Sequence, residues 1–208
     1  MDSIKIVGIS GSLRTGSFTK MAVDIALQGA KENGAQTELI DLKEYELVSC
    51  DGREDVDSYP ADVQKMRTQV KEARGIILGT PEYHGNMSGV LKNALDLMGW
   101  DEFEGKMVGL VGVAGGSVGA MNSLLSLREV GRSLHCWVIP KQVSIANAYE
   151  MFNDDGSLKD EKLNERVKQV GDHVAKYAHL HMLGKSAEFL KAWEREIENP
   201  GAESYQQD

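Results

Sequence analysis

A short stretch near the N-terminus, residues 10–19, has the residue types of a site for a single phosphate group. Its glycines allow backbone N–H groups to turn toward an anion, and a helix starting behind it would add its positive end. The candidate side chains are Ser10, Ser12, Arg14, Ser17, Phe18 and Thr19. Four hydroxyls and a guanidinium exceed what the cap of a helix requires, so the stretch predicts a phosphate-binding loop.

The same loop argues against two other nucleotide sites. Gly11 and Gly16 have the glycine spacing of a P-loop, but Ser17 and Phe18 stand where that motif carries Lys and Ser or Thr. Without the Lys, an ATPase or GTPase is not expected. No Gly-x-Gly-x-x-Gly follows the first predicted strand, so a dinucleotide site is not indicated either. What remains is a pocket for one phosphate, such as the terminal phosphate of FMN.

Two further loops could hold the edge of a flat ring system. The second loop, residues 80–89, combines a rigid proline, an aromatic ring, polar side chains and glycines. The third loop, residues 114–119, is rich in glycine. The candidate residues are Pro81, Glu82, Tyr83, His84, Gly85, Gly115 and Gly116. Taken singly, Tyr83 could equally be a packing residue, His84 a surface or packing histidine, Glu82 a solvated charge, and the third loop a flexible turn. The argument is stronger for each loop as a unit.

The hydrophobic pattern places each of these loops directly after a strand. Compact apolar runs predict strands over residues 4–9, 37–42, 75–79, 107–113 and 135–139, and helical spacing predicts helices over residues 21–33, 63–73, 88–98, 121–130, 161–182 and 186–198. This alternation indicates an α/β protein with helices on both faces of a parallel sheet. It suits a flavodoxin-like doubly wound fold, with five parallel strands in the order 2-1-3-4-5 and ligands beyond their carboxyl ends. The polar, acidic stretch of residues 44–60 is expected to form a long excursion of the chain over the surface.

The composition limits the possible partners and the cellular location. The chain has 208 residues and a net charge of −9, which argues against general affinity for nucleic acid or an anionic membrane. Cys50 and Cys136 lie far apart and fit no metal-ligand spacing, and neither a signal peptide nor a membrane-spanning run is evident. We therefore expect a soluble cytoplasmic protein without a metal site, with one domain at residues 1–183 and a helical extension with a polar tail at 184–208.

Two segments together resemble the NADPH-dependent FMN reductase family, which includes NAD(P)H-dependent FMN, quinone, azo-dye and chromate reductases. They are residues 8–17 (Gly-Ile-Ser-Gly-Ser-Leu-Arg-Thr-Gly-Ser) and residues 81–84 (Pro-Glu-Tyr-His) leading into 89–96 (Gly-Val-Leu-Lys-Asn-Ala-Leu-Asp). The resemblance covers residues 1–182. The family usually has Asn at the position of His84, Pro at that of Ser88 and Asn at that of Thr19. The first two departures fall beside the expected ring and bear on the choice of substrate.

The resemblance implies a non-covalently bound FMN whose phosphate lies in the first loop, with NADPH or NADH as co-substrate. A hydride would pass to the flavin, and two electrons would then reach a small-molecule acceptor: a quinone, an azo compound, free flavin or a metal oxyanion. No catalytic side chain is expected, because flavin N5 carries the chemistry. The resemblance also implies a homodimer or homotetramer. Lys92, Asn93 and Asp96 are interpreted as helix-surface and loop-anchoring residues.

A function of another class fits the same loops. The protein could be an FMN-binding electron carrier or a redox-regulated interaction protein without efficient NAD(P)H turnover, and its acidic surface would suit docking onto a basic partner. A flavin-free homologue is a third possibility. The Pro-Glu-Tyr segment favours the reductase.

Overall fold

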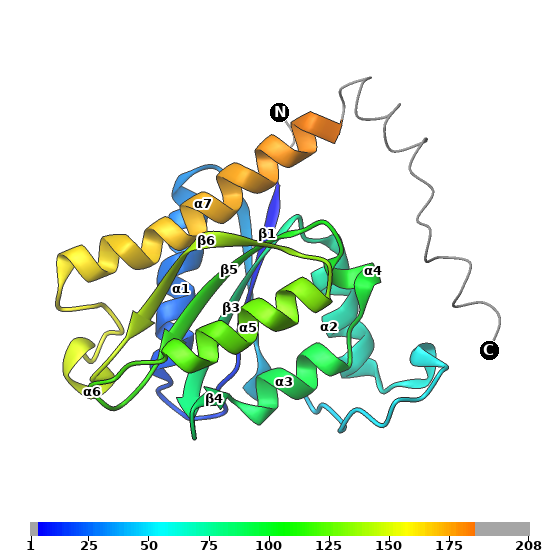
Figure 1. Ribbon diagram of the computed structural model, residues 1–208, viewed down its shortest axis with the longest axis horizontal. Coiled ribbons are helices and arrows are strands. Elements are labelled where there is room, and N and C mark those ends of the chain that lie inside the picture. The colour runs from blue at the N-terminus through cyan, green and yellow to red at the C-terminus, as the bar shows by residue number, and fades with distance from the viewer. Residues whose placement is uncertain (1–3, 186–208) are drawn as a thin grey trace. The chain divides into compact units, whose positions relative to one another are not determined.

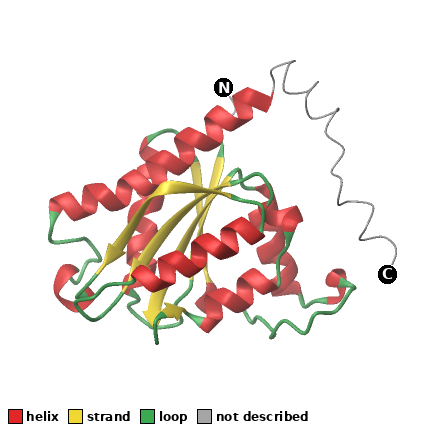
Figure 2. Ribbon diagram, viewed as in Figure 1, coloured by secondary structure: helices red, strands yellow, loops and turns green. Residues whose placement is uncertain are grey.

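The computed structural model describes residues 4–185, and its centre is a parallel sheet with helices on both faces (Figures 1 and 2). Five parallel strands run in the order β2-β1-β3-β5-β6, which confirms the predicted topology. Their bounds are β1 Lys5–Ser10, β2 Gln36–Asp41, β3 Gly75–Tyr83, β5 Met107–Val113 and β6 Trp137–Ile145. The strand count is one higher than predicted, because the two-residue β4 (Asn86–Met87) pairs antiparallel with the end of β3.

The helices divide between the two faces according to the alternation of side chains along the strands. The main helices are α1 Phe18–Glu32, α2 Ala61–Glu72, α3 Gly89–Asp96, α5 Met121–Ser133 and α7 Glu161–Lys185. Short ones are α4 Trp100–Phe103, α6 Ala148–Met151 and the 3-10 turns Leu42–Glu44 and Val56–Ser58. Successive strand residues point to opposite faces. Val7 and Ile9 of β1 therefore pack in the core beneath α2, α3 and α5, while Gly8 between them meets α1.

Strand β6 differs most from its prediction. The sequence indicated a strand ending at residue 139, because Pro140 interrupts the apolar run, whereas β6 continues to Ile145. It is an edge strand, where a proline is tolerated. The register also shifts: two residues of β5, from Val108 to Leu110, pair with residues 138 and 142 of β6. The extra residues bulge out of the pairing, which lets the strand pass the proline.

Helices α1 and α7 touch each other backbone to backbone. A Cβ at Gly171 of α7 would lie 1.7 Å from the carbonyl oxygen of Ala26, and one at Gly29 of α1 would lie 2.0 Å from that of Lys168. Real Cβ atoms essentially never come this close to another heavy atom. The two helices can cross at this distance only because both positions are glycine.

The acidic excursion after the second strand is tied to α3 by an asparagine. The side chain of Asn93 accepts a hydrogen bond from Cys50 N (2.9 Å) and donates one to Val48 O (2.9 Å). This contact agrees with the interpretation of Asn93 as a loop anchor. Neither Cys50 nor Cys136 is in a disulfide.

The described part of the chain ends at Lys185, the last residue given for α7. No helix among residues 4–185 has both the length and the apolar character needed to cross a bilayer. The first of two compact units in the chain extends to Ala178. The predicted helix over residues 186–198 lies outside the described residues, and the predicted division of the chain at residue 183 stays a prediction.

Candidate functional site

The first loop, which connects β1 to α1, passes very close to the neighbouring strand β3 at the carboxyl edge of the sheet. Gly11 N donates to Gly79 O of β3 at 2.9 Å. A Cβ at position 11 would lie 2.7 Å from the Cβ of Leu91 and 2.9 Å from that carbonyl oxygen, so the crossing requires glycine. The loop then enters α1 through Ser17, whose Oγ accepts a hydrogen bond from Lys20 N at 3.2 Å. The sequence therefore places the start of α1 directly over the carboxyl edge of the sheet.

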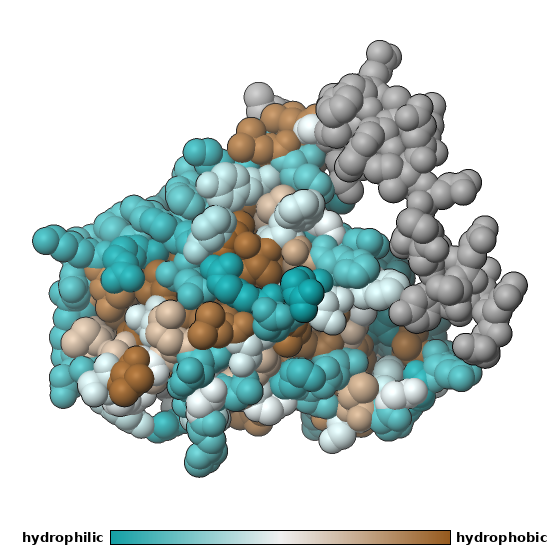
Figure 3. Space-filling view, viewed as in Figure 1, coloured by the Kyte–Doolittle hydropathy of each residue, from teal (hydrophilic) through white to brown (hydrophobic). Residues whose placement is uncertain are grey.

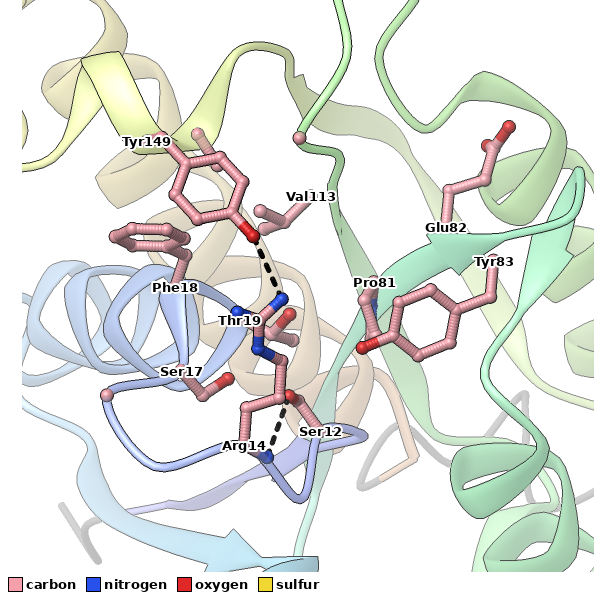
Figure 4. Close-up of a pocket in the computed structure, with 13 residues that line it drawn as sticks. Ser12, Arg14, Ser17, Phe18, Thr19, Pro81, Glu82, Tyr83, Val113 and Tyr149 are labelled. Atoms are coloured by element: carbon pink, nitrogen blue, oxygen red, sulfur yellow. Dashed lines mark hydrogen bonds between the residues drawn. The ribbon is translucent and has the colours of Figure 1, made fainter.

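An open pocket lies at this edge (Figure 4). The predicted residues that line it are Ser12, Arg14, Ser17, Phe18, Thr19, Pro81, Glu82, Tyr83 and Gly115. The other lining residues are Gly16, Val113, Ala148 and Tyr149. Ser10, His84, Gly85 and Gly116 do not line it, and their proposed contacts with a ligand stay predictions.

One end of the pocket has the donor set of a phosphate site. The hydroxyl-bearing residues Ser12, Ser17 and Thr19 are buried, yet all three line the pocket. The first amides of a helix lack helical partners. Ser17 accepts hydrogen bonds from Lys20 N through its Oγ and from Met21 N through its carbonyl oxygen. The N–H groups of Phe18 and Thr19 have no such partner among residues 4–185, so they are available to a ligand. Neutral donors at a helix N-terminus, with Arg14 at the rim, fit a single terminal phosphate.

Ser10, the first residue of the predicted phosphate loop, does not line the pocket with these donors. It is fully buried at the end of β1. Within residues 4–185, its Oγ is the one buried side-chain oxygen or nitrogen that has no hydrogen-bond partner. Buried hydroxyls normally have a partner, so this atom is an exception in an otherwise satisfied interior.

Glu82 lines the pocket, but its carboxylate points away from it in Figure 4. The carboxylate accepts hydrogen bonds from Ser123 N (3.1 Å), Ser123 Oγ (3.2 Å) and Asn122 Nδ2 (3.2 Å). These groups lie in the first turn of α5, whose N-cap, Ala120, offers no side-chain cap. Glu82 therefore caps α5 from the second loop and fixes the loop against that helix.

His84 and Gly85 form the tip of the turn between β3 and β4. Both have left-handed backbone conformations, with φ of 52° and 77°. Among residues other than glycine, Asn, Asp and His are the ones enriched in that region. Position 84 therefore suits the His of this chain as well as the Asn that the family resemblance leads one to expect, because both tolerate the turn.

Ser88 joins the first loop to the second. Its Oγ donates to Gly11 O at 2.6 Å and accepts from Leu91 N at 3.2 Å, which caps α3, while its N–H donates to Thr80 Oγ1 at 3.0 Å. A proline here would have neither the hydroxyl nor the N–H. The departure from the family pattern at Ser88 thus adds contacts that hold two of the pocket loops together.

We expect Ser88→Ala to lower the free energy of unfolding by about 2 kcal/mol, because it removes a helix cap and leaves the carbonyl of Gly11 without its buried donor. Urea unfolding measures the change. Ser58→Ala, which removes an exposed hydroxyl bonded to Asp55 O, is the control and should change stability by no more than about 0.5 kcal/mol. Equal effects of the two substitutions would contradict the joining role of Ser88.

A fourth segment, which the sequence analysis missed, closes the pocket. Helix α6 follows β6, and Asn147 N and Ala148 N donate to Gly116 O and Ala114 O of the third loop, both at 3.1 Å. This places Tyr149 beside the pocket, where its hydroxyl accepts a hydrogen bond from Arg14 Nη1 at 3.0 Å. That bond raises the pKa of the Arg14 guanidinium. No local signal in the sequence marks Tyr149, because Pro140 ends the apolar run before the strand itself ends.

Comparison with known proteins agrees with the fold and the loops. The model of the family described as NADPH-dependent FMN reductase matches residues 4–150. An NAD(P)H-dependent FMN reductase of Pseudomonas aeruginosa is 34% identical over 177 residues, covering 81% of this chain and 91% of the relative. An FMN-dependent NADPH-azoreductase of Staphylococcus saprophyticus is 33% identical over 174 residues, covering 81% and 92%.

Solved structures share the fold at lower sequence identity. The flavoenzyme FerB of Paracoccus denitrificans, an NAD(P)H:(acceptor) oxidoreductase, superposes with a TM-score of 0.69 at 20% identity, over 86% of this chain and 98% of that one. The family model covers the three pocket loops and the segment that carries Tyr149. On these grounds, the chain belongs to the NADPH-dependent FMN reductase family.

Proposed function

We propose that the pocket binds FMN without a covalent bond, with the phosphate at the first loop and the ring between the second and third loops. As a member of its family, the chain is an NAD(P)H-dependent oxidoreductase with FMN as cofactor. The observation that carries the proposal is the set of buried hydroxyls and free helix amides that meet in one pocket with Arg14. When bound, FMN supplies the redox chemistry by accepting a hydride from NAD(P)H and passing two electrons to an acceptor.

The protein's own groups would bind and orient the cofactor. Ser12, Ser17, Thr19 and the start of α1 would hold the phosphate, while Pro81, Tyr83 and Gly115 would flank the ring. Backbone N–H groups of the second and third loops would stabilise negative charge on the ring, as donors do in an oxyanion hole. No side chain need serve as a nucleophile or an obligatory acid, and no metal is proposed.

We expect Arg14→Ala to weaken FMN binding by about tenfold to a hundredfold, because a hydrogen bond from a charged donor contributes about 1.5–3 kcal/mol. Quenching of FMN fluorescence on binding measures the dissociation constant. The midpoint of thermal unfolding should hardly change, since Arg14 is exposed. Arg132→Ala, in an exposed pair with Glu129 on α5, is the control. Unchanged FMN affinity in Arg14→Ala would overturn the phosphate assignment.

Anaerobic mixing of the FMN-loaded protein with NADPH, and separately with NADH, tests the reductase function and the nucleotide preference. Rapid bleaching of the yellow flavin absorbance is expected. Slow or absent bleaching would instead support the electron carrier, and purified protein without bound flavin that also fails to take up FMN would support the flavin-free homologue.

The electron acceptor is proposed from the relatives. They include FMN-dependent NADPH-azoreductases, so we propose a small aromatic acceptor, an azo compound or a quinone, with free flavin and metal oxyanions as the other classes to test. A panel of these acceptors with the holoprotein would rank them by kcat/KM. We expect no function in binding nucleic acid or membranes, in line with the net charge of −9.

We also propose a homodimer or homotetramer in the cytoplasm. Met121 and Leu125 are exposed large apolar side chains one turn apart on α5, and Figure 3 shows apolar surface among the hydrophilic side chains of the face that carries this helix. The two unpaired cysteines suit a reducing compartment. Light scattering coupled to size-exclusion chromatography would measure the mass of the assembly.

A further inference from the structure

Arg14 and Tyr149 meet at the mouth of the pocket, although they are 135 residues apart in sequence. Arg14 Nη1 donates to the Tyr149 hydroxyl at 3.0 Å, the bond drawn as a dashed line in Figure 4. The guanidinium carbon also lies 5.8 Å from the centre of the tyrosine ring. The pair connects the first loop to α6, so two walls of the pocket are joined by side chains.

Burial alone does not explain the position of Tyr149, because the residue is 60% exposed. Its ring meets Phe18 edge to face, with centroids 5.3 Å apart, and lies over the third loop. A Cβ at Gly115 would come within 3.0 Å of its Cε2 atom, so the glycine makes room for the ring. The backbone bonds of Asn147 and Ala148 to the third loop fix the start of α6. The tyrosine hydroxyl is therefore presented to Arg14 from a fixed support.

We propose that Tyr149 is a positioning residue for the cofactor: its hydroxyl holds Arg14 at the mouth of the pocket, ready for the phosphate of FMN. The inference rests on the proposed function. An arginine side chain has five N–H donors, and the bond to Tyr149 uses one of them, which leaves the others for a phosphate. A free, exposed arginine loses conformational entropy when a ligand immobilises it. Tyr149 reduces this loss by restricting Arg14 before the ligand arrives.

The test compares Tyr149→Phe with Arg14→Ala and with the double variant. Phenylalanine keeps the ring against Phe18 and removes only the hydroxyl. We expect Tyr149→Phe to weaken FMN binding about threefold to tenfold, chiefly through faster dissociation, as loss of one hydrogen bond predicts. In the Arg14→Ala background the same substitution should change the affinity by no more than about twofold, because its effect passes through Arg14. Fluorescence titration gives the affinities, and stopped-flow displacement gives the dissociation rates.

Tyr45→Phe is the matched control, because it removes a tyrosine hydroxyl that donates to Gln69 Oε1 at 2.7 Å, outside the pocket lining. It should leave FMN affinity unchanged. Unchanged affinity in Tyr149→Phe, or an equal loss with and without Arg14, would overturn the positioning role. Failure of the unaltered protein to bind FMN would instead contradict the proposed function, so the two outcomes are distinguishable.

Discussion

Gly171→Ala is expected to lower the free energy of unfolding by about 3 kcal/mol, the upper part of the usual range for overpacking. The new Cβ would lie 1.7 Å from Ala26 O, 2.7 Å from Ala26 C and 2.9 Å from Ala30 N. These are backbone atoms of α1, which cannot rotate away as a side chain would. Alanine gains about 1 kcal/mol in helix propensity over glycine, which is too little to compensate for moving the helix. Urea unfolding followed by circular dichroism measures the change.

Two variants make this prediction sharper. Gly89→Ala also places alanine in a helix, but a Cβ there meets nothing within 4 Å, so its stability should be unchanged or slightly higher. Gly29→Ala should destabilise the protein as Gly171→Ala does, since its Cβ would lie 2.0 Å from Lys168 O. The double variant should cost less than the sum, because helices already moved apart have room for the second methyl. A Gly171→Ala protein as stable as the unaltered one would contradict the close crossing.

Arg67→Met is expected to destabilise the protein by about 3–5 kcal/mol, the cost of removing one partner from a buried ion pair. Glu102 in α4 is only 2% exposed, and its carboxylate accepts hydrogen bonds from Arg67 Nε at 3.1 Å and from Gly99 N at 2.7 Å. Without Arg67, the buried carboxylate would keep one backbone donor and lose the cation that pairs with it. The measurement is the free energy of unfolding at pH 7 from urea titration.

A neighbouring ion pair supplies the control for this variant. Lys71 and Asp101 also link α2 to α4, at 3.2 Å, but both side chains are exposed. Lys71→Met should therefore cost about 0.5 kcal/mol or less. The double variant with Arg67→Met and Glu102→Gln should recover part of the lost stability, because it removes the uncompensated charge. If Arg67→Met lowered the free energy of unfolding no more than Lys71→Met does, the buried pair would contribute no more to stability than the exposed one.

The sequence predicted the sheet and three of the pocket segments because local patterns determine them. Short apolar runs mark buried strands, and the carboxyl ends of parallel strands must meet at one edge, so the loops at residues 10–19, 80–89 and 114–119 were expected to lie together. Their glycines and prolines are local signals of turns. The hydroxyls of Ser12, Ser17 and Thr19 accordingly line a common pocket.

The parts that could not be predicted depend on contacts between distant residues. Tyr149 was missed because Pro140 ends the apolar run, and only the edge position of β6 allows the strand to continue. That Glu82 caps α5 depends on its distance from Ser123, which no spacing in the sequence reports. Glycines such as Gly171 and Gly29 read as weak points of a helix, and only the crossing of α1 and α7 shows that they are required.

The bulge in β6 also bears on how copies of the chain behave at high concentration. An edge strand presents unpaired N–H and C=O groups that can pair with the edge of another molecule and start aggregation. In β6 this row of groups is broken, because Pro140 has no N–H to donate and the residues around it leave the regular pairing. The irregularity that extends β6 toward the pocket thus also protects the open side of the sheet from edge-to-edge association.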